Sequence, residues 1–391
     1  MKKCLKILFV LVIAAIIGLC CLYRYFECNP IHMGGGGPSD SPPARCYAKE
    51  QEQQRKTQMA QLEQLAALEF TCKKEERPPL SKETQQLYNY ALYHDLHNMW
   101  TGDKGDDVWN GLARYYRIAA ANGDYKANVR LQYLLNTGRI STDMPQTEVH
   151  NLNEELAKQL PATAYYNLYG YLDVGYGVRT EKDGKYAYLR KAADLGSREA
   201  QYTVAEMLAD IEDSEETQEA FKYRLNLVKQ LRSCASEQGL GEVSSNLGIS
   251  LQMDKKYQEA LKVFHQGVKN GDSISALVLS HAFESGVQAD NLNFLDVSPD
   301  DERVKRYHMI SSYLSRYDYL QPKVPDLDEI LPLPPAKLPE WNGKIAFQRW
   351  YEGEAPPKPS EALMQKLANQ AGLRVDTGLD LETGLPREVK K

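Results

Sequence analysis

Two histidines and one carboxylate-rich loop are the residues of this chain whose spacing comes nearest to a metal site. His94 and His97 are three residues apart, so on a helix they would share a face and could bind one ion. No third or fourth ligand accompanies them, and an ordinary pair on a helix surface is the favoured interpretation. The loop Asp103–Asp107 lacks the ordered ligand pattern of a calcium site. The sequence therefore predicts no metal and no cofactor.

The motifs of nucleophilic, zinc and nucleotide chemistry are also missing. The sequence contains no G-x-S-x-G elbow, no H-E-x-x-H, no G-x-x-x-x-G-K-[ST] and no C-x-x-C. Pairs of carboxylates do not indicate a catalytic site in this chain, because 26% of its residues are charged and such pairs are common. We therefore expect no catalytic residues and no enzyme. The formal net charge of −6 argues against duplex nucleic acid as a partner.

Tyrosine is the residue type of this chain that best fits an interface with a partner protein. The chain has 25 tyrosines, and many of them lie between residues 165 and 188. Tyrosine combines contact area with a hydroxyl group at little entropic cost, and it is enriched at interfaces. Packing between helices is the competing explanation for several of these rings, and an acidic insertion at 211–218 is a second candidate surface. The candidate partner-binding residues are Tyr165, Tyr169, Tyr176, Tyr186, Glu212, Asp213, Glu215 and Glu216.

Four cysteines are candidates for disulfides in an oxidising compartment: Cys28, Cys46, Cys72 and Cys234. If residues 46–72 formed one continuous helix, its ends would stand about 39 Å apart, which excludes a direct bridge between Cys46 and Cys72. The pairs Cys28–Cys46 and Cys72–Cys234 are possible, and so is an unpaired thiol at each site. The sequence cannot choose between them.

A repeated helix-turn-helix unit must position these residues. In its most complete copy, Ala164–Ala200, apolar residues recur every four positions on one helix face, and Gly175 and Gly196 mark the two turns. Equivalent copies begin 32 to 43 residues apart, by subtraction of their first residue numbers, and such a period is typical of solenoids. These first residues are Ala91, Ala127, Ala164, Ala200, Val243 and Ser275.

The spacing and signature of these copies resemble the Sel-like repeat (SLR), a relative of the tetratricopeptide repeat with the pattern A-x-x-x-L-G, then G-x-G-V, then A-A-x-x-G. The residues of the third copy that match it are Ala164, Leu168, Gly175, Gly177, Val178, Ala192, Ala193, Gly196 and Ala200. Tyr169 departs from the pattern, which has glycine there. The resemblance covers roughly Ser81–Val287 and implies an all-α fold, an α/α solenoid that serves as a binding scaffold.

The first 24 residues predict a signal anchor or a signal peptide. Three lysines precede an uncharged run from Ile7 to Leu22, which is longer than the apolar core of a cleavable signal peptide and just long enough to span a membrane. We expect an inner-membrane anchor, favoured over a lipoprotein acylated at Cys20 or Cys21. The positive-inside rule then places the rest of the chain in the periplasm of a Gram-negative bacterium.

The remaining sequence divides by composition. Residues 25–45 predict a flexible linker, 46–79 an amphipathic helix and its connector, 80–318 the solenoid, and 319–391 an extended proline-rich cap, a short helix and a tail. Six prolines between Leu320 and Pro339 exclude a regular helix. We expect this segment to pack along the solenoid as a C-terminal cap, and a partner-binding arm is the alternative. Ser360 and Gly372 predict the two ends of the short helix.

Together these features predict a membrane-tethered periplasmic solenoid that binds a protein. The repeats and the proline-rich block Leu331–Trp341 resemble a bacterial envelope family that includes immunity proteins of type VI secretion lipase effectors. This resemblance implies an immunity protein that neutralises a secreted antibacterial effector, with a phospholipase as the implied class, by covering its active site or its access to the membrane. The alternative is an envelope scaffold or regulatory adaptor built on the same repeats.

Overall fold

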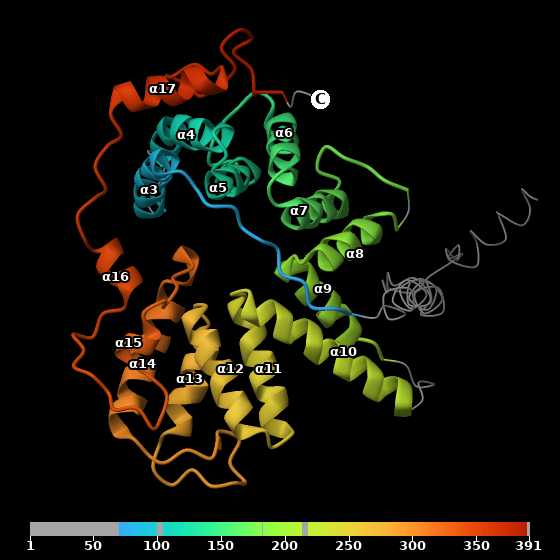
Figure 1. The fold of residues 1–391 in the computed structure, drawn as a ribbon, viewed down its shortest axis with the longest axis vertical. Helices are drawn as coiled ribbons and strands as arrows, with labels where there is room; N and C mark the ends of the chain where they lie inside the picture. Colours follow the sequence, from blue (N-terminus) through green and yellow to red (C-terminus); the bar gives the residue numbers. More distant parts are fainter. Residues whose placement is uncertain (1–69, 100–104, 182, 213–217, 389–391) are drawn as a thin grey trace, which may run out of the picture. The chain divides into compact units, whose positions relative to one another are not determined.

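Six pairs of helices, one for each predicted repeat, form the body of the structure (Figure 1). The computed structural model describes residues 70–99, 105–181, 183–212 and 218–388. All of them belong to the second of the two units into which the chain divides, Leu68–Lys391. The first helices of the pairs are α3 (Lys82–His97), α5 (Tyr125–Asn136), α7 (Pro161–Val174), α9 (Arg198–Ala209), α11 (Gly241–Met253) and α13 (Ser273–Ala282). The second helices are α4 (Gly105–Ala121), α6 (Pro145–Ala157), α8 (Lys185–Leu195), α10 (Gln218–Glu237), α12 (Tyr257–Lys269) and α14 (Asp301–Arg316).

The predicted repeat starts explain why these helices pack as they do. Each lies inside a first helix and is buried, from Ala91 in α3 to Ser275 in α13. The predicted turn glycines have left-handed backbone angles, such as Gly175 after α7 with φ of 66° and Gly196 after α8 with φ of 105°. Glycine adopts this region without a steric penalty, so each helix can end and reverse. The prediction of an all-α solenoid is confirmed.

Two large apolar clusters occupy the two ends of the solenoid. The first is built from α3 to α6 and from C-terminal residues between Met364 and Leu373, with Tyr116, Ile118 and Leu131 among its fully buried side chains. The second is built from α11 to α14, around Phe264 and Tyr307. Each repeat therefore buries its apolar face against its neighbours rather than in one central globule.

A buried carboxylate interrupts the apolar pattern in the first repeat. Asp95 stands where the other repeats have apolar residues, yet it is fully buried. Its carboxylate accepts hydrogen bonds from Trp109 Nε1 at 2.9 Å, the Tyr116 hydroxyl at 2.9 Å and Arg130 Nε at 2.6 Å. These partners satisfy the charge, which is why burial is tolerated at this position.

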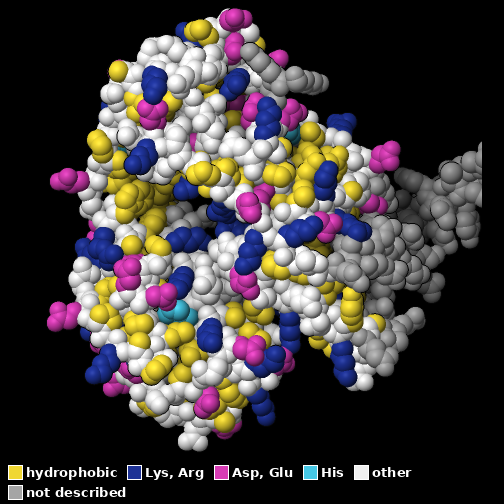
Figure 2. All heavy atoms as spheres, viewed as in Figure 1, with side chains coloured by type: hydrophobic (Ala, Val, Ile, Leu, Met, Phe, Trp, Pro, Cys, Tyr) yellow, Lys and Arg dark blue, Asp and Glu magenta, His cyan; other side chains and the backbone are white. Residues whose placement is uncertain are grey.

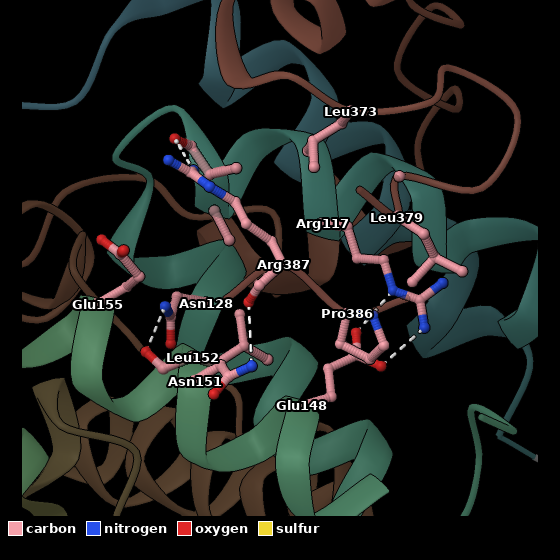
Figure 3. A pocket seen from close by; sticks show the side chains of 13 residues that line it. Arg117, Asn128, Glu148, Asn151, Leu152, Glu155, Leu373, Leu379, Pro386 and Arg387 are labelled. Atoms are coloured by element: carbon pink, nitrogen blue, oxygen red, sulfur yellow. Dashed lines mark hydrogen bonds and ion pairs between the residues drawn. The ribbon is translucent and has the colours of Figure 1, made fainter. Parts of the chain in front are cut away.

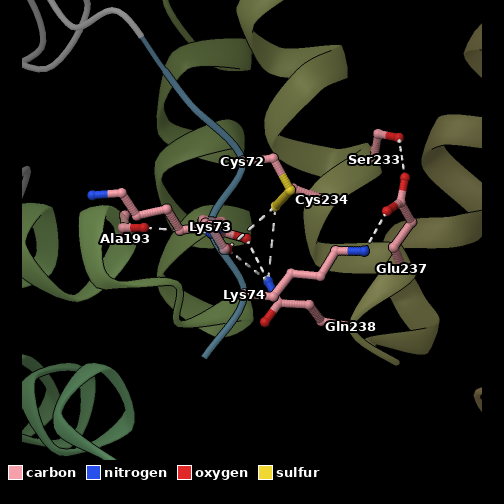
Figure 4. Close-up of a disulfide and its surroundings, with 9 residues drawn as sticks. Cys72, Lys73, Lys74, Ala193, Ser233, Cys234, Glu237 and Gln238 are labelled. Atoms are coloured by element: carbon pink, nitrogen blue, oxygen red, sulfur yellow. Dashed lines mark hydrogen bonds and ion pairs between the residues drawn. A yellow bond between two sulfur atoms is a disulfide. The ribbon is translucent and has the colours of Figure 1, made fainter. Parts of the chain in front are cut away.

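Residues 70–80, which we call the strap, run from α10 past the turn between α8 and α9 to the N-terminus of α7 before α3 begins. A disulfide joins Cys72 to Cys234 of α10, one of the pairings that the sequence left open, and Gln201 donates to the Lys73 carbonyl at 2.9 Å (Figure 4). The Glu75 carboxylate accepts from the backbone N–H of Ala162 at 2.6 Å, so it caps α7, whose own N-cap residue makes no side-chain bond. The strap thus holds the third and fourth repeats together.

The C-terminal segment covers both ends of the solenoid. After η2 (Asp318–Leu320), the side chains of Leu327, Leu331 and Ile345 are buried in the second apolar cluster, as the predicted cap requires. Its expected extended course is interrupted by a one-turn helix, α15 (Leu327–Ile330), which fits between two prolines. α16 (Ala346–Tyr351) and α17 (Glu361–Ala371) then return to α3 and α4, where Lys366 pairs with Glu83 at 2.7 Å (Figure 1).

The ends of α17 confirm the prediction made for the short helix. The Ser360 side chain accepts from the N–H of Leu363, and Gly372 ends the helix with φ of 69°. The expected anchor, linker and amphipathic helix of residues 1–69 lie outside the described residues. Within the part of the chain that the structure describes, no helix has the length and apolarity that crossing a membrane requires.

Candidate protein-binding surface

The third repeat, α7 with α8, is packed by small side chains and carries five of its tyrosines outside the two apolar clusters. Its buried residues are Ala162, Ala164, Leu189, Ala192 and Ala193. Small residues let the helix backbones approach closely, so the contact between the helices does not need aromatic rings. Five tyrosines of this repeat, which we call the tyrosine cluster, are each only partly buried: Tyr165, Tyr166, Tyr169, Tyr186 and Tyr188.

The rings of the tyrosine cluster contact one another across the two helices. Tyr165 stacks on Tyr188 with 6.2 Å between ring centroids, and Tyr169 lies 6.3 Å from Tyr186. Tyr166 lies 6.0 Å from Tyr169, and Tyr165 and Tyr169 are four residues apart on one face of α7. Three of the sequence-predicted residues, Tyr165, Tyr169 and Tyr186, therefore share one surface. Such a surface offers apolar area together with hydroxyl groups that can donate and accept.

Two lysines lie over rings of the tyrosine cluster, and one of them, Lys185, is 5.1 Å from the centroid of the Tyr186 ring. The Lys191 ammonium lies 4.2 Å from the centroid of the Tyr165 ring, in cation–π geometry. Lys185 pairs with Asp173, and this hydrogen bond raises the pKa of Lys185. Burial, followed by the neighbouring Asp173 carboxylate, raises the pKa of Tyr169, so its hydroxyl stays protonated at neutral pH. The surface can therefore donate hydrogen bonds throughout the physiological range.

The other sequence-predicted site residues do not join this surface. Tyr176 lies on the side of α6, where His150 Nε2 is 2.8 Å from its carbonyl oxygen and its ring packs beside Tyr171. Glu212 is exposed beyond the end of α9. The remaining acidic candidates, Asp213, Glu215 and Glu216, lie outside the described residues, as do Cys28 and Cys46.

A hollow with charged walls lies near the centre of the face seen in Figure 2, where basic side chains gather. Beside the strap, a cavity of about 270 Å³ is lined by Lys74, Arg77, Arg198 and Glu199 among others. Arg198 Nε is 2.7 Å from Glu199, and Lys74 is 2.6 Å from Glu237. These pairs neutralise most of the charge there, so the cavity makes a poor anion site.

A second cavity lies between the C-terminal tail and helices α4 and α6 (Figure 3). Arg117 pairs with Glu148 at 2.6 Å and also donates to the Thr377 carbonyl at 3.0 Å, while Asn151 donates to the Arg387 carbonyl at 3.1 Å. The space left is about 40 Å³, whereas sites for small molecules measure about 300 Å³ or more. This contact therefore secures the tail and leaves no room for a ligand.

The two histidines singled out by their spacing lie among aromatic rings, and both contact Tyr93. The ring centroid of His97 lies 4.1 Å from that of Tyr93 and 4.0 Å from that of Tyr351 in α16. Burial, with a smaller contribution from His97, lowers the pKa of His94. Among the residues that the structure describes, no group of three or more His, Cys, Asp or Glu side chains is placed to hold a metal ion.

Comparison with protein families finds one match, to a domain of unknown function (DUF6396), over residues 275–386. That stretch begins in α13 and ends in the tail that lies on α4 and α6, so it touches both ends of the solenoid. Curated proteins provide no match to the chain.

Several solved structures are similar to this chain. The immunity protein Pa5087 from Pseudomonas aeruginosa is 23% identical, with a TM-score of 0.45 over 68% of this chain and 95% of that one. The immunity protein PA5088 from the same organism is 19% identical, with a TM-score of 0.48 over the same shares. A Sel1 repeat protein from Oxalobacter formigenes is 18% identical, with a TM-score of 0.35 over 59% of this chain and 97% of that one. The likeness concerns the fold.

Proposed function

We propose that this chain is a protein-binding solenoid, tethered in the envelope of a Gram-negative bacterium, that neutralises a secreted antibacterial effector by binding it. The observation that carries the proposal is the tyrosine cluster, whose rings meet between α7 and α8 and stay partly exposed. Aromatic residues with free edges and hydroxyl groups are the side chains that most often dominate the binding energy of protein interfaces. The tether rests on the apolar run of residues 7–22.

The mechanism that we propose is steric. The strap and its disulfide to Cys234 fix the third and fourth repeats, so the tyrosine cluster is held on a preorganised scaffold. Preorganisation reduces the ordering that binding must impose and so strengthens a complex of given area. A bound effector, of the type VI secretion class and with lipase activity as the implied chemistry, would have its active site or its route to the membrane covered.

Contact competition tests this proposal. The proposal expects a gene for the effector beside this one, and a strain lacking both genes is mixed on a solid surface with its parent, which secretes the effector. The proposal expects the deletion strain to die and re-expression of residues 1–391 to rescue it. Survival of the deletion strain beside a parent shown to be secreting effectors would contradict the proposal and favour an envelope scaffold.

Two variants test whether the tyrosine cluster binds the effector. Replacing Tyr165, Tyr169 and Tyr186 together by alanine should abolish rescue, since each hot-spot tyrosine contributes about 2 kcal/mol or more to a typical interface. Tyr223 of α10, which is 55% exposed, provides the matched control, and Tyr223→Ala should rescue like the wild type. Equal rescue by both variants would place the interface elsewhere on the chain.

A further inference from the structure

A cavity that is larger than the two described above lies between the exposed face of α14 and the C-terminal segment that leads into α16. Its volume is about 720 Å³, which falls within the range of about 300 to 1,000 Å³ of sites for small molecules. One wall consists of α14 residues between His308 and Arg316, and the other lies between Trp341 and Gln348. Both walls belong to the stretch 275–386, which matches the domain of unknown function. The cavity is therefore a candidate ligand site of that domain.

Contacts outside the cavity hold its C-terminal wall in place. Arg306 of α14 donates to the Pro339 carbonyl at 2.8 Å, and its guanidinium carbon lies 5.6 Å from the centroid of the Trp341 ring. Arg349 of α16 pairs with Asp326 at 3.0 Å. The wall therefore keeps its place without a ligand, and a preformed cavity reduces the ordering that binding must impose.

Aromatic rings line both walls of the cavity. On the α14 side, the ring centroids of Tyr313 and Tyr317 lie 4.7 Å apart, and the rings are tilted by 40°. Trp341 belongs to the other wall and is only partly buried. Burial, followed by the nearby Glu352 carboxylate, raises the pKa of Tyr313, so its hydroxyl stays protonated and can donate. Aromatic side chains prefer edge-on or offset contacts with another ring, so the cavity suits a ligand with a flat aromatic body.

One arginine gives this aromatic cavity a positive charge. Arg316 in the last turn of α14 is exposed, and it makes no hydrogen bond or ion pair with the residues that the structure describes. None of the described residues that line the cavity is Asp or Glu. The neighbouring Glu352 is paired with Lys344 at 2.7 Å, and Asp318 lies in η2, outside the lining. A single unpaired guanidinium matches the charge of a monoanion, which favours a carboxylate over a phosphate.

We infer that this cavity binds a small aromatic carboxylate, with its carboxylate on the Arg316 guanidinium and its ring between Tyr317 and Trp341. The guanidinium fork matches the two oxygen atoms of a carboxylate. Ser312 and Ser315, one turn apart on α14, add hydroxyl groups that can donate to the same oxygen atoms. The cavity lies on the last repeat and the C-terminal segment, whereas the tyrosine cluster lies on the third repeat. The inference therefore goes beyond the proposed function and does not rest on it.

Indole-3-propionate and its amide, indole-3-propionamide, are the probes, because they share an aromatic body and differ in the charge of the head group. Each is titrated onto the full chain and followed by saturation-transfer NMR. A probe of this size that fits the cavity should bind with a dissociation constant of about 1 mM or tighter. We expect the carboxylate to bind about tenfold more tightly than the amide, since only the carboxylate forms charge-assisted hydrogen bonds to the arginine. Absence of carboxylate binding, or equal affinity for the two probes, would overturn the inference.

Two matched arginine variants identify the group that binds the carboxylate. Arg316→Gln should weaken binding of the carboxylate about tenfold and leave binding of the amide nearly unchanged, and the retained amide binding also shows that the variant is folded. Arg179 is likewise exposed and without an ion pair in the part of the chain that the structure describes, and Arg179→Gln should change neither affinity. Equal losses for the two variants would contradict the role of Arg316.

A blocking variant locates the probes on the chain. Ser312→Trp places a large side chain in the cavity from an exposed position of α14, so it should abolish binding of both probes without lowering the melting temperature. Binding that survives this substitution would place the probes elsewhere and overturn the inference. Because no effector enters these titrations, their result and the result of the contact competition are independent.

Discussion

The contact between the strap and Gly196 offers a quantitative test of how the scaffold is held together. Gly196 ends α8 with φ of 105°, and a Cβ atom placed there would lie 2.7 Å from the Glu75 nitrogen and 2.9 Å from the Lys74 carbonyl carbon. Both neighbours are backbone atoms, so the strap would have to move away. The substitution Gly196→Ala should therefore displace the Glu75 carboxylate from the N-terminus of α7 as well as strain its own backbone.

The magnitude follows from these two effects. A positive φ costs an alanine about 1 kcal/mol. Loss of the carboxylate that caps α7 through Ala162 costs about 1 to 2 kcal/mol more. Gly286 has a φ of 87°, and no atom lies within 4 Å of a Cβ added there. Gly286→Ala therefore strains the backbone without displacing a neighbour, and comparing the two variants separates backbone strain from the loss of the cap. We expect Gly196→Ala to lower the free energy of unfolding by about 1 to 2 kcal/mol more than Gly286→Ala does.

Urea denaturation followed by far-ultraviolet circular dichroism measures both variants. A second substitution, Glu75→Ala, completes a double-mutant cycle with Gly196→Ala. If the strap has already moved, adding Glu75→Ala should cost almost nothing further, whereas in the wild type it should cost the full capping energy. Equal losses for the two glycine variants, or additive losses in the cycle, would refute the reasoning.

Three further predictions concern groups whose environment departs from the ordinary. Removing the disulfide by Cys72→Ser with Cys234→Ser should lower the free energy of unfolding by up to about 5 kcal/mol, because the bridge spans 162 residues. If reductant leaves the thermal melt of the wild-type protein unchanged, this prediction is wrong. Asp95→Asn leaves the Arg130 guanidinium without its carboxylate and should cost about 3 kcal/mol in urea denaturation, and a loss below about 1 kcal/mol would speak against the buried network. Burial lowers the pKa of Lys323 to about 8, so the unfolded chain binds that proton more tightly than the folded one. Raising the pH from 7 to 9.5 should therefore increase the urea midpoint of the wild type more than that of Lys323→Gln. The increase should be smaller than the full pKa shift implies, because the Lys323 side chain keeps contact with solvent. Identical pH profiles for the two proteins would contradict a lowered pKa of Lys323.

The repeats were predictable from the sequence because their determinants are local. A buried small residue at most starts, such as Ala127 or Ala200, and a glycine at most turns recur every 32 to 43 residues, and both act within a few residues of themselves. The short C-terminal helix was predictable for the same reason, since Ser360 and Gly372 each act on the adjacent turn.

Several contacts between the repeats, the strap and the C-terminal segment join residues far apart in the sequence, and no local sequence pattern predicts them. Glu75 caps a helix that begins 86 residues later at Pro161, by subtraction, and Tyr351 stacks on His97 from 254 positions away. Asp95 broke the apolar pattern at a repeat position, and its partner Arg130 occupies the polar position of the next repeat. The position three residues after the start is polar in the first five repeats, and this is the signal that would have revealed the network.

Direct measurement of binding between this chain and the effector that the proposal expects its gene neighbour to encode tests the central claim most directly. Isothermal titration of the two purified proteins should give a tight complex, and alanine at Tyr165, Tyr169 and Tyr186 should weaken it at least 100-fold while Tyr223→Ala leaves it unchanged. Absence of binding by the wild-type chain, or equal affinity for the triple variant, would contradict the account.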